Sequence, residues 1–134
     1  MLPHTLDTLR LSVHVLAATI WVGGQFTLAG LVPGLRELGD DVPRTVACRF
    51  NRIAWPAYAV LVATGIWNLL ELPVGDFDTR WQVTLMVKIT VVALAGASAA
   101  IHAGARSTAM LAIFGALGGL TSIGAVVLGL MLHG

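Results

Sequence analysis

Charged residues are scarce in this chain, and their scarcity excludes most soluble folds. Only 11% of the 134 residues are charged, against about a quarter in a soluble domain, and the mean hydropathy is +0.85. Cys48 is the single cysteine, which excludes an internal disulfide and any zinc or iron–sulfur site built from cysteines. The chain also lacks a run of basic residues, so we expect no nucleic-acid partner.

Long apolar segments are what the chain does contain. Four of them cover residues 11–32, 53–70, 81–101 and 108–132. The length of each is close to the ~20 residues that a helix needs to cross the hydrocarbon core of a bilayer. We therefore predict an all-α integral membrane protein: an antiparallel, up-down-up-down four-helix bundle in a single transmembrane domain over residues 1–134. The predicted helices cover residues 8–32, 44–70, 79–104 and 108–132.

The connections carry residues that end and begin helices. Pro33-Gly34 is expected to close the first helix, and residues 40–43 place two aspartates and a proline where the second helix begins. Asp78 is a predicted cap of the third helix. The turn over residues 104–107 is so short that the last two helices must be antiparallel neighbours.

Basic residues are distributed unequally between the two ends of the predicted helices. One side carries five arginines and the other only two, which by the positive-inside rule places both termini outside a bacterial-type cytoplasmic (inner) membrane. The five are Arg36, Arg44, Arg49, Arg52 and Arg106, and the two are Arg10 and Arg80.

Three ionisable residues lie within the apolar segments: His14, Lys88 and His102. Such residues are costly in hydrocarbon, usually face the interior of a bundle, and often mark function. Helix direction predicts an outer polar layer with His14, Lys88 and Asn68, and an inner layer that includes Gln25, Arg52 and His102. His14 and His102 are then about 20 Å apart along the membrane normal, too far to share one metal ion.

The first helix carries a stripe at helical spacing formed by His14, Trp21, Gln25 and Leu28. A neutral imidazole in a helical bundle is a good axial ligand for haem iron, so His14 is the predicted ligand and His102 marks a second candidate site. Trp21 and Gly24 would form a wall against which a flat ring could lie. Lys88 and Arg52 would neutralise the haem propionates.

Copper is the alternative metal, with His14 and His102 as its candidate ligands. The soft ligands that Cu(I) prefers are few and scattered, since the chain offers only Cys48 and three methionines beyond Met1. A third alternative is a structural membrane subunit in which the polar residues only join helices. Each histidine would then form a hydrogen bond to a neighbouring helix.

Glycine is frequent in the last apolar segment. Gly115 and Gly119 form a small-xxx-small pair, which allows two helix backbones to approach closely. This pair predicts either packing inside the bundle or a homodimer interface. Membrane lipid is the only other partner that the composition predicts.

Several motifs resemble those of known families. His14 followed by Trp21-Val-Gly-Gly24, the segment 49–56 (RFNRIAWP), the segment 64–67 (TGIW), and Trp81 followed by Leu85-Met-Val-Lys88 resemble the copper resistance protein D (CopD) domain. They are also similar to the HemJ-type protoporphyrinogen oxidases, another four-helix group. The resemblance implies either copper uptake and resistance or a b-type haem, with His14 as the ligand and Lys88 and Arg52 as its charged partners.

These observations give one hypothesis and two alternatives. The hypothesis is a membrane protein that binds haem b through His14 and serves electron transfer or redox homeostasis linked to haem or copper, with a membrane oxidoreductase activity left open. The first alternative is a CopD-like copper uptake or resistance protein without haem. The second is a structural subunit without a cofactor.

Overall fold

The computed structural model describes residues 5–134 and is entirely helical over that range, without strands. The chain divides into two compact units, which are described separately: a first hairpin up to Leu72 and a second from Pro73 onward. Each contributes two helices long and apolar enough to cross a membrane, so the predicted all-α membrane fold with four spans is confirmed.

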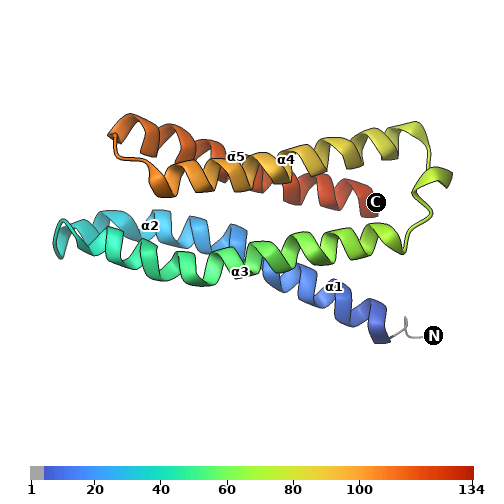
Figure 1. Cartoon of the computed structure of the whole chain (residues 1–134), viewed down its shortest axis with the longest axis horizontal. Coiled ribbons are helices and arrows are strands. Elements are labelled where there is room, and N and C mark those ends of the chain that lie inside the picture. The colour runs from blue at the N-terminus through green and yellow to red at the C-terminus, as the bar shows by residue number, and fades with distance from the viewer. Residues whose placement is uncertain (1–4) are drawn as a thin grey trace. The chain divides into compact units, whose positions relative to one another are not determined.

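The first hairpin is built from two long helical segments joined by a short turn (Figure 1). Its first span is continuous from Thr5 to Glu37 and consists of α1 (Thr5–Ala18), a π-helical turn η1 (Thr19–Gly23) and α2 (Gly24–Glu37). α3 (Val42–Leu70) returns along α1, η1 and α2. Gly39, with φ of +148°, allows the sharp reversal between α2 and α3.

The first helix does not end at Pro33, where the sequence predicts its end. Proline has a φ compatible with a helix, although it lacks the N–H for one backbone hydrogen bond and its ring crowds the carbonyl four residues earlier. The helix tolerates both effects at Pro33. The chain therefore continues for one more turn to Glu37, after which Leu38 N bonds to Leu35 O at 3.1 Å. Pro43 lies in the first turn of α3 as predicted, and Asp41 precedes that helix without a capping side-chain hydrogen bond.

The second hairpin contains a short 3₁₀ turn η2 (Val74–Asp76), then α4 (Thr79–Gly104) and α5 (Thr108–His133). The predicted cap is confirmed, because a carboxylate oxygen of Asp78 accepts a hydrogen bond from Trp81 N at 2.8 Å. Ser107 caps α5 in the same way, accepting from Met110 N at 3.2 Å. α4 and α5 pack against each other as antiparallel neighbours (Figure 1).

Burial in both hairpins is the inverse of that in a soluble protein. The buried positions are mostly small, whereas large apolar side chains are exposed along all the spans, as expected for helices that pack closely and face lipid. The buried residues are Ala17, Trp21, Ala54, Ala57 and Thr64 in the first hairpin, and Leu85, Ala95, Gly96, Ser98, Gly118 and Ser122 in the second.

Gly115 provides the space in which His102 joins the two helices of the second hairpin. The Nδ1–H of His102 donates a hydrogen bond to the carbonyl of Leu111 at 2.8 Å. A Cβ atom added to Gly115 would lie 3.1 Å from Cε1 and 3.2 Å from Nδ1 of that ring. One residue of the predicted small-xxx-small pair therefore serves packing within the hairpin, while the homodimer stays a prediction.

We predict that Gly115→Ala destabilises the protein although alanine is the better helix former. The change would normally gain about 0.5–1 kcal/mol in a helix, but here the new methyl displaces the His102 ring and breaks its bond to Leu111, for a net loss of about 1 kcal/mol. Equilibrium unfolding in detergent micelles measures the difference. Gly104→Ala, with open space around the added methyl, is the control and should not lose stability. Equal gains in stability for both variants would contradict this role of His102.

Candidate functional site

His14 lies on α1 and is held by α3. Its Nδ1 is 2.8 Å from Oγ1 of Thr64, a buried residue of α3, and the ring itself is half-buried. The Thr64 hydroxyl is in turn 2.7 Å from the carbonyl oxygen of Val60, to which it donates. Because that hydroxyl has a single proton and already donates it within α3, it accepts from His14. A neutral imidazole in this arrangement would carry its proton on Nδ1, so that Nε2 would be the ring nitrogen able to ligate a metal.

Small residues surround this imidazole. Gly65 follows Thr64, and a Cβ placed on it would lie 3.5 Å from Cε1 of His14, which is an ordinary contact distance. Ala17, one turn further along α1, is buried. The sequence contains Thr64-Gly65 within a motif, but helix arithmetic placed Asn68 and not Thr64 at the level of His14. Thr64 is the residue opposite His14, and Asn68 lies one helical turn further along α3.

Asn68 instead belongs to a polar cluster one turn nearer the start of α1. Nε of Arg10 donates to Oδ1 of Asn68 at 2.5 Å, and the same guanidinium is 3.1 Å from a carboxylate oxygen of Asp7 and 5.6 Å from the centre of the Trp67 ring. Arg10 is four residues before His14, and Asn68 is four residues after Thr64. The two pairs thus form successive rungs between antiparallel helices.

An aromatic cluster follows along the same hairpin. Trp21 is only 3% exposed, and the centre of its ring lies 5.4 Å from that of Trp55 and 4.5 Å from that of Tyr58. Trp21 lies in the π-helical turn η1. Such turns are rare in proteins overall, and those that occur are often at functional sites. The sequence predicted Trp21 as a wall of the site and Trp55 as part of an interfacial aromatic belt, but it did not predict that Trp55 and Tyr58 pack around Trp21.

Two buried side-chain N–H donors in this region have no hydrogen-bond partner among residues 5–134. They are Nε1 of Trp21 and Nε2 of Gln25, which are four residues apart along the first span. Leaving a buried donor unsatisfied costs about 1–3 kcal/mol. Such a cost is informative at a candidate site, because an acceptor atom of a bound group would remove it.

Gly24 and Arg52 lie away from His14. A Cβ at Gly24 would overlap the ring of Phe50, so the flat ring that approaches this glycine is a phenyl group of α3. Arg52 is exposed and precedes Thr64 by twelve residues, a rise of about 18 Å along the helix. The first hairpin therefore brings together His14, Thr64 and Gly65, and it does not bring Arg52 to them.

Lys88 and His102 both lie in the second hairpin. Lys88 is half-buried, and a Cβ at Gly129 of α5 would be 3.2 Å from its Nζ, so the ammonium lies directly against the α5 backbone. His102 follows Lys88 by fourteen residues; it is exposed and hydrogen-bonded to the carbonyl of Leu111. This spacing corresponds to about 21 Å along α4, so the two side chains do not share one site.

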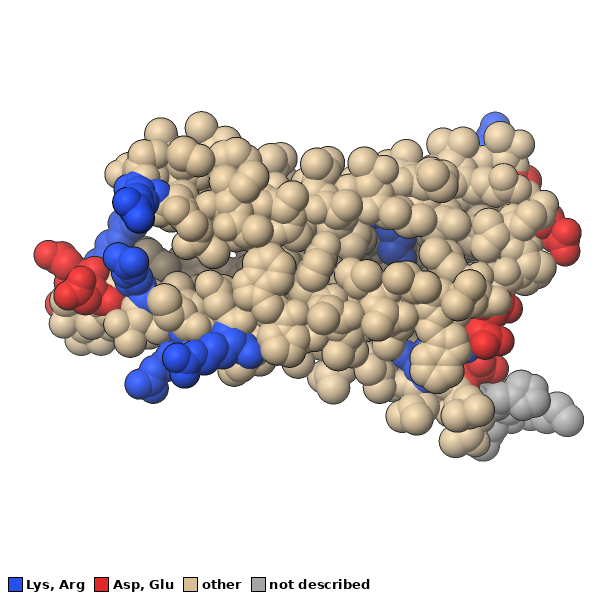
Figure 2. Space-filling model, in the orientation of Figure 1, with Lys and Arg blue, Asp and Glu red and all other residues tan. Residues whose placement is uncertain are grey.

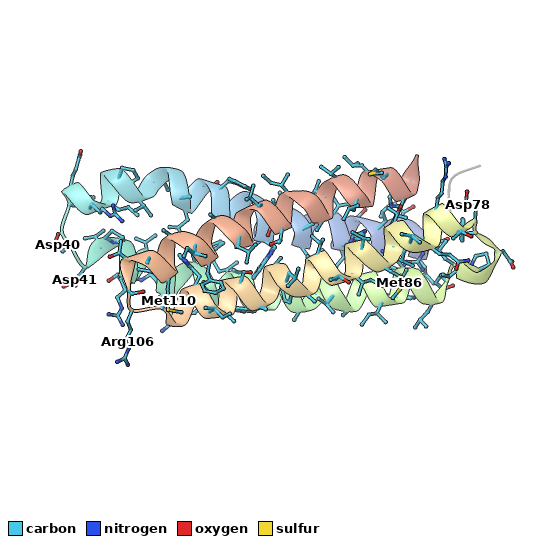
Figure 3. The ribbon with its side chains drawn as sticks, turned by 90° about the horizontal axis from the view of Figure 1, so that it is seen from above. Asp40, Asp41, Asp78, Met86, Arg106 and Met110 are labelled. Atoms are coloured by element: carbon cyan, nitrogen blue, oxygen red, sulfur yellow. The ribbon has the colours of Figure 1, made fainter. Side chains whose placement is uncertain are left out.

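Clustered metal ligands are not found in the described part of the chain. Residues 5–134 contain no group of three or more His, Cys, Asp and Glu side chains that could hold a metal ion. Cys48 is exposed, and Met86 is 64% exposed. Met86 and Met110 lie near opposite ends of the second hairpin (Figure 3). A metal bound here would depend on single imidazoles.

Comparison with known proteins gives one match. The family model for copper resistance protein D matches residues 44–133, which include most of α3 and the whole of α4 and α5. The match begins after α1, so His14 lies outside it. No curated protein and no solved structure matches the chain. Because the match covers well over half of the sequence, the chain belongs to the copper resistance protein D (CopD) family of membrane proteins.

Proposed function

We propose that this CopD-family membrane protein binds haem b in its first hairpin, where His14 would ligate the iron, and takes part in electron transfer or redox homeostasis. The observation that carries the proposal is the chain of hydrogen bonds from His14 through Thr64 to Val60. A histidine that ligates a metal almost always donates its other ring N–H to a fixed acceptor. The bond to Thr64 supplies that acceptor and favours the tautomer in which Nε2 is the ligating nitrogen.

The surroundings of His14 fit such a group in two further respects. Trp21, Trp55 and Tyr58 form an aromatic cluster further along the same hairpin. The unsatisfied N–H groups of Trp21 and Gln25 are donors without an acceptor, and the polar edge of a haem carries acceptor oxygens. When bound, haem supplies one-electron chemistry whose potential depends on the axial ligand and on the burial of the site.

Copper handling is the second candidate function, and the family match favours it. Imidazole nitrogen is a good ligand for copper, so the same Nε2 of His14 would bind the ion as cargo. The exposed positions of Cys48, Met86 and Met131 argue against a buried soft-ligand path for Cu(I) among the described residues. Both candidates therefore depend on His14.

We expect His14→Ala to abolish pigment binding. Reduced-minus-oxidised spectra of the purified, detergent-solubilised protein should show a b-type α-band in the wild type and none in the variant. His102→Ala is the matched control and should keep the band, because the His102 ring is exposed and bonded to Leu111. A colourless wild type that retains copper, lost only in His14→Ala, would replace haem with copper. Absence of both pigment and copper from the wild type would refute both functions.

Thr64→Val should weaken metal binding without removing the ligand. The substitution keeps the shape of the side chain and deletes the acceptor that fixes the tautomer of His14. Loss of such a supporting hydrogen bond typically costs 10–100-fold in affinity. Haem titration followed by absorbance measures the change. Thr90→Val removes a hydroxyl that bonds only within α4, at 3.0 Å from Met86 O, and should leave affinity within about twofold. An unchanged affinity in Thr64→Val would show that the bond to His14 is structural only.

Gln25→Met should stabilise the cofactor-free protein, by about 1–2 kcal/mol, because it removes a buried N–H without a partner. It should also reduce the rise in melting temperature that haem produces. Gln82→Met is the matched control: Nε2 of Gln82 donates to Phe77 O at 2.9 Å, so its loss should destabilise the protein with or without haem. Parallel destabilisation by both variants would mean that Gln25 has an acceptor in the cofactor-free protein.

A further inference from the structure

Three arginines line one hollow on the surface of α3, near the turn that follows α2. The hollow has a volume of about 360 Å³ and is lined by Arg44, Thr45, Cys48, Arg49 and Arg52. Basic groups are gathered at this end of the first hairpin (Figure 2). No carboxylate lines the hollow, although Asp40 and Asp41 occupy the neighbouring turn (Figure 3).

These guanidinium groups are uncompensated. Within residues 5–134, Arg10 forms an ion pair with Asp7. Over the same range, none of the three arginines in the hollow forms an ion pair or a side-chain hydrogen bond. Arginine is always charged, and its planar group binds carboxylate or phosphate oxygens in pairs. Three such groups around one hollow of this size fit a phosphate-bearing group.

The length of α3 places this hollow at the membrane surface. The helix has 29 residues, whereas about 20 suffice to cross the hydrocarbon core. The segment from Ile53 to Leu70 contains no charged residue, so the surplus lies at the arginine end. The guanidinium groups therefore lie at the depth of lipid headgroups.

An exposed apolar stripe continues from the hollow toward the hydrocarbon. Ile53, Pro56 and Val60 follow Arg49 at four, seven and eleven residues, which places them on the same face of α3. All three are exposed, Ile53 by 60% and Val60 by 40%. The hollow and the stripe together match a molecule with an anionic head and an apolar tail.

We propose that this surface binds one acidic phospholipid, with its phosphate among Arg44, Arg49 and Arg52 and an acyl chain along Ile53, Pro56 and Val60. The arrangement favours a lipid over free phosphate because the apolar stripe has no role in binding an inorganic anion. This binding site is independent of His14 and of the haem or copper that His14 is proposed to ligate.

The test compares two double variants that remove the same charge from the full chain in detergent. Arg44→Gln/Arg49→Gln empties two positions of the hollow and leaves Arg52 untouched, whereas Arg36→Gln/Arg80→Gln removes two exposed arginines outside it. Binding of phosphatidylglycerol and phosphatidylcholine is measured by native mass spectrometry. We expect about a thirtyfold loss of phosphatidylglycerol affinity in the first variant and little change in the second, since each basic residue near an anionic lipid contributes about a fivefold factor.

Several outcomes would overturn the proposal. Equal affinity of the wild type for both lipids would exclude headgroup recognition, and equal losses in both double variants would reduce the effect to net charge. Stabilisation by inorganic phosphate as large as that by phosphatidylglycerol would identify a free-anion site. Arg44→Lys/Arg49→Lys controls for misfolding, because it keeps the charge and should retain most of the lipid selectivity. Circular dichroism measures the helix content of all variants.

Discussion

The hydrogen bond between His14 and Thr64 is the interaction on which the functional interpretation depends. In hydrocarbon, a polar group must find its partner within the protein, because no water competes for it. Thr64 meets this requirement in two directions, accepting from His14 and donating to Val60. The imidazole is thereby fixed in orientation. A metal ligand needs this preorganisation, and a residue that only joins helices would form the same bond.

In both hairpins a polar side chain reaches from one helix to the next near the end opposite the connecting turn. In the first hairpin Arg10 reaches Asn68, and in the second the indole N–H of Trp81 donates to Leu132 O at 3.2 Å. Lys88 differs from these, because its ammonium lies against Gly129 without an ion pair among residues 5–134. Even half-buried, a cation in a membrane-spanning helix is costly, and such residues usually mark function.

Composition and hydropathy predicted the four spans, the antiparallel hairpins and the Asp78 cap, because these depend on local sequence alone. The register between α1 and α3 could not be obtained in the same way. Helix arithmetic placed Asn68 near the level of His14, and the structure places Thr64 opposite His14 with Asn68 one turn further on. An uncertainty of one turn in the helix ends is enough to account for that offset. Arg52 was predicted to assist a cofactor from its type and approximate depth, but its face depends on how α3 packs. Nothing in the sequence indicated that Trp21 and Gln25 would be buried without acceptors.

The π-helical turn at Thr19–Gly23 has a consequence for how the first span would respond to an occupant. A π turn accommodates one residue more than an α turn, so its conversion to α-helix would rotate everything beyond it by about 100°. Gln25 and Leu28 would then rotate together about the helix axis. His14 precedes the turn and would keep its position beside Thr64. The relative rotation of the two parts of this membrane span is therefore set by the five residues of the π-helical turn.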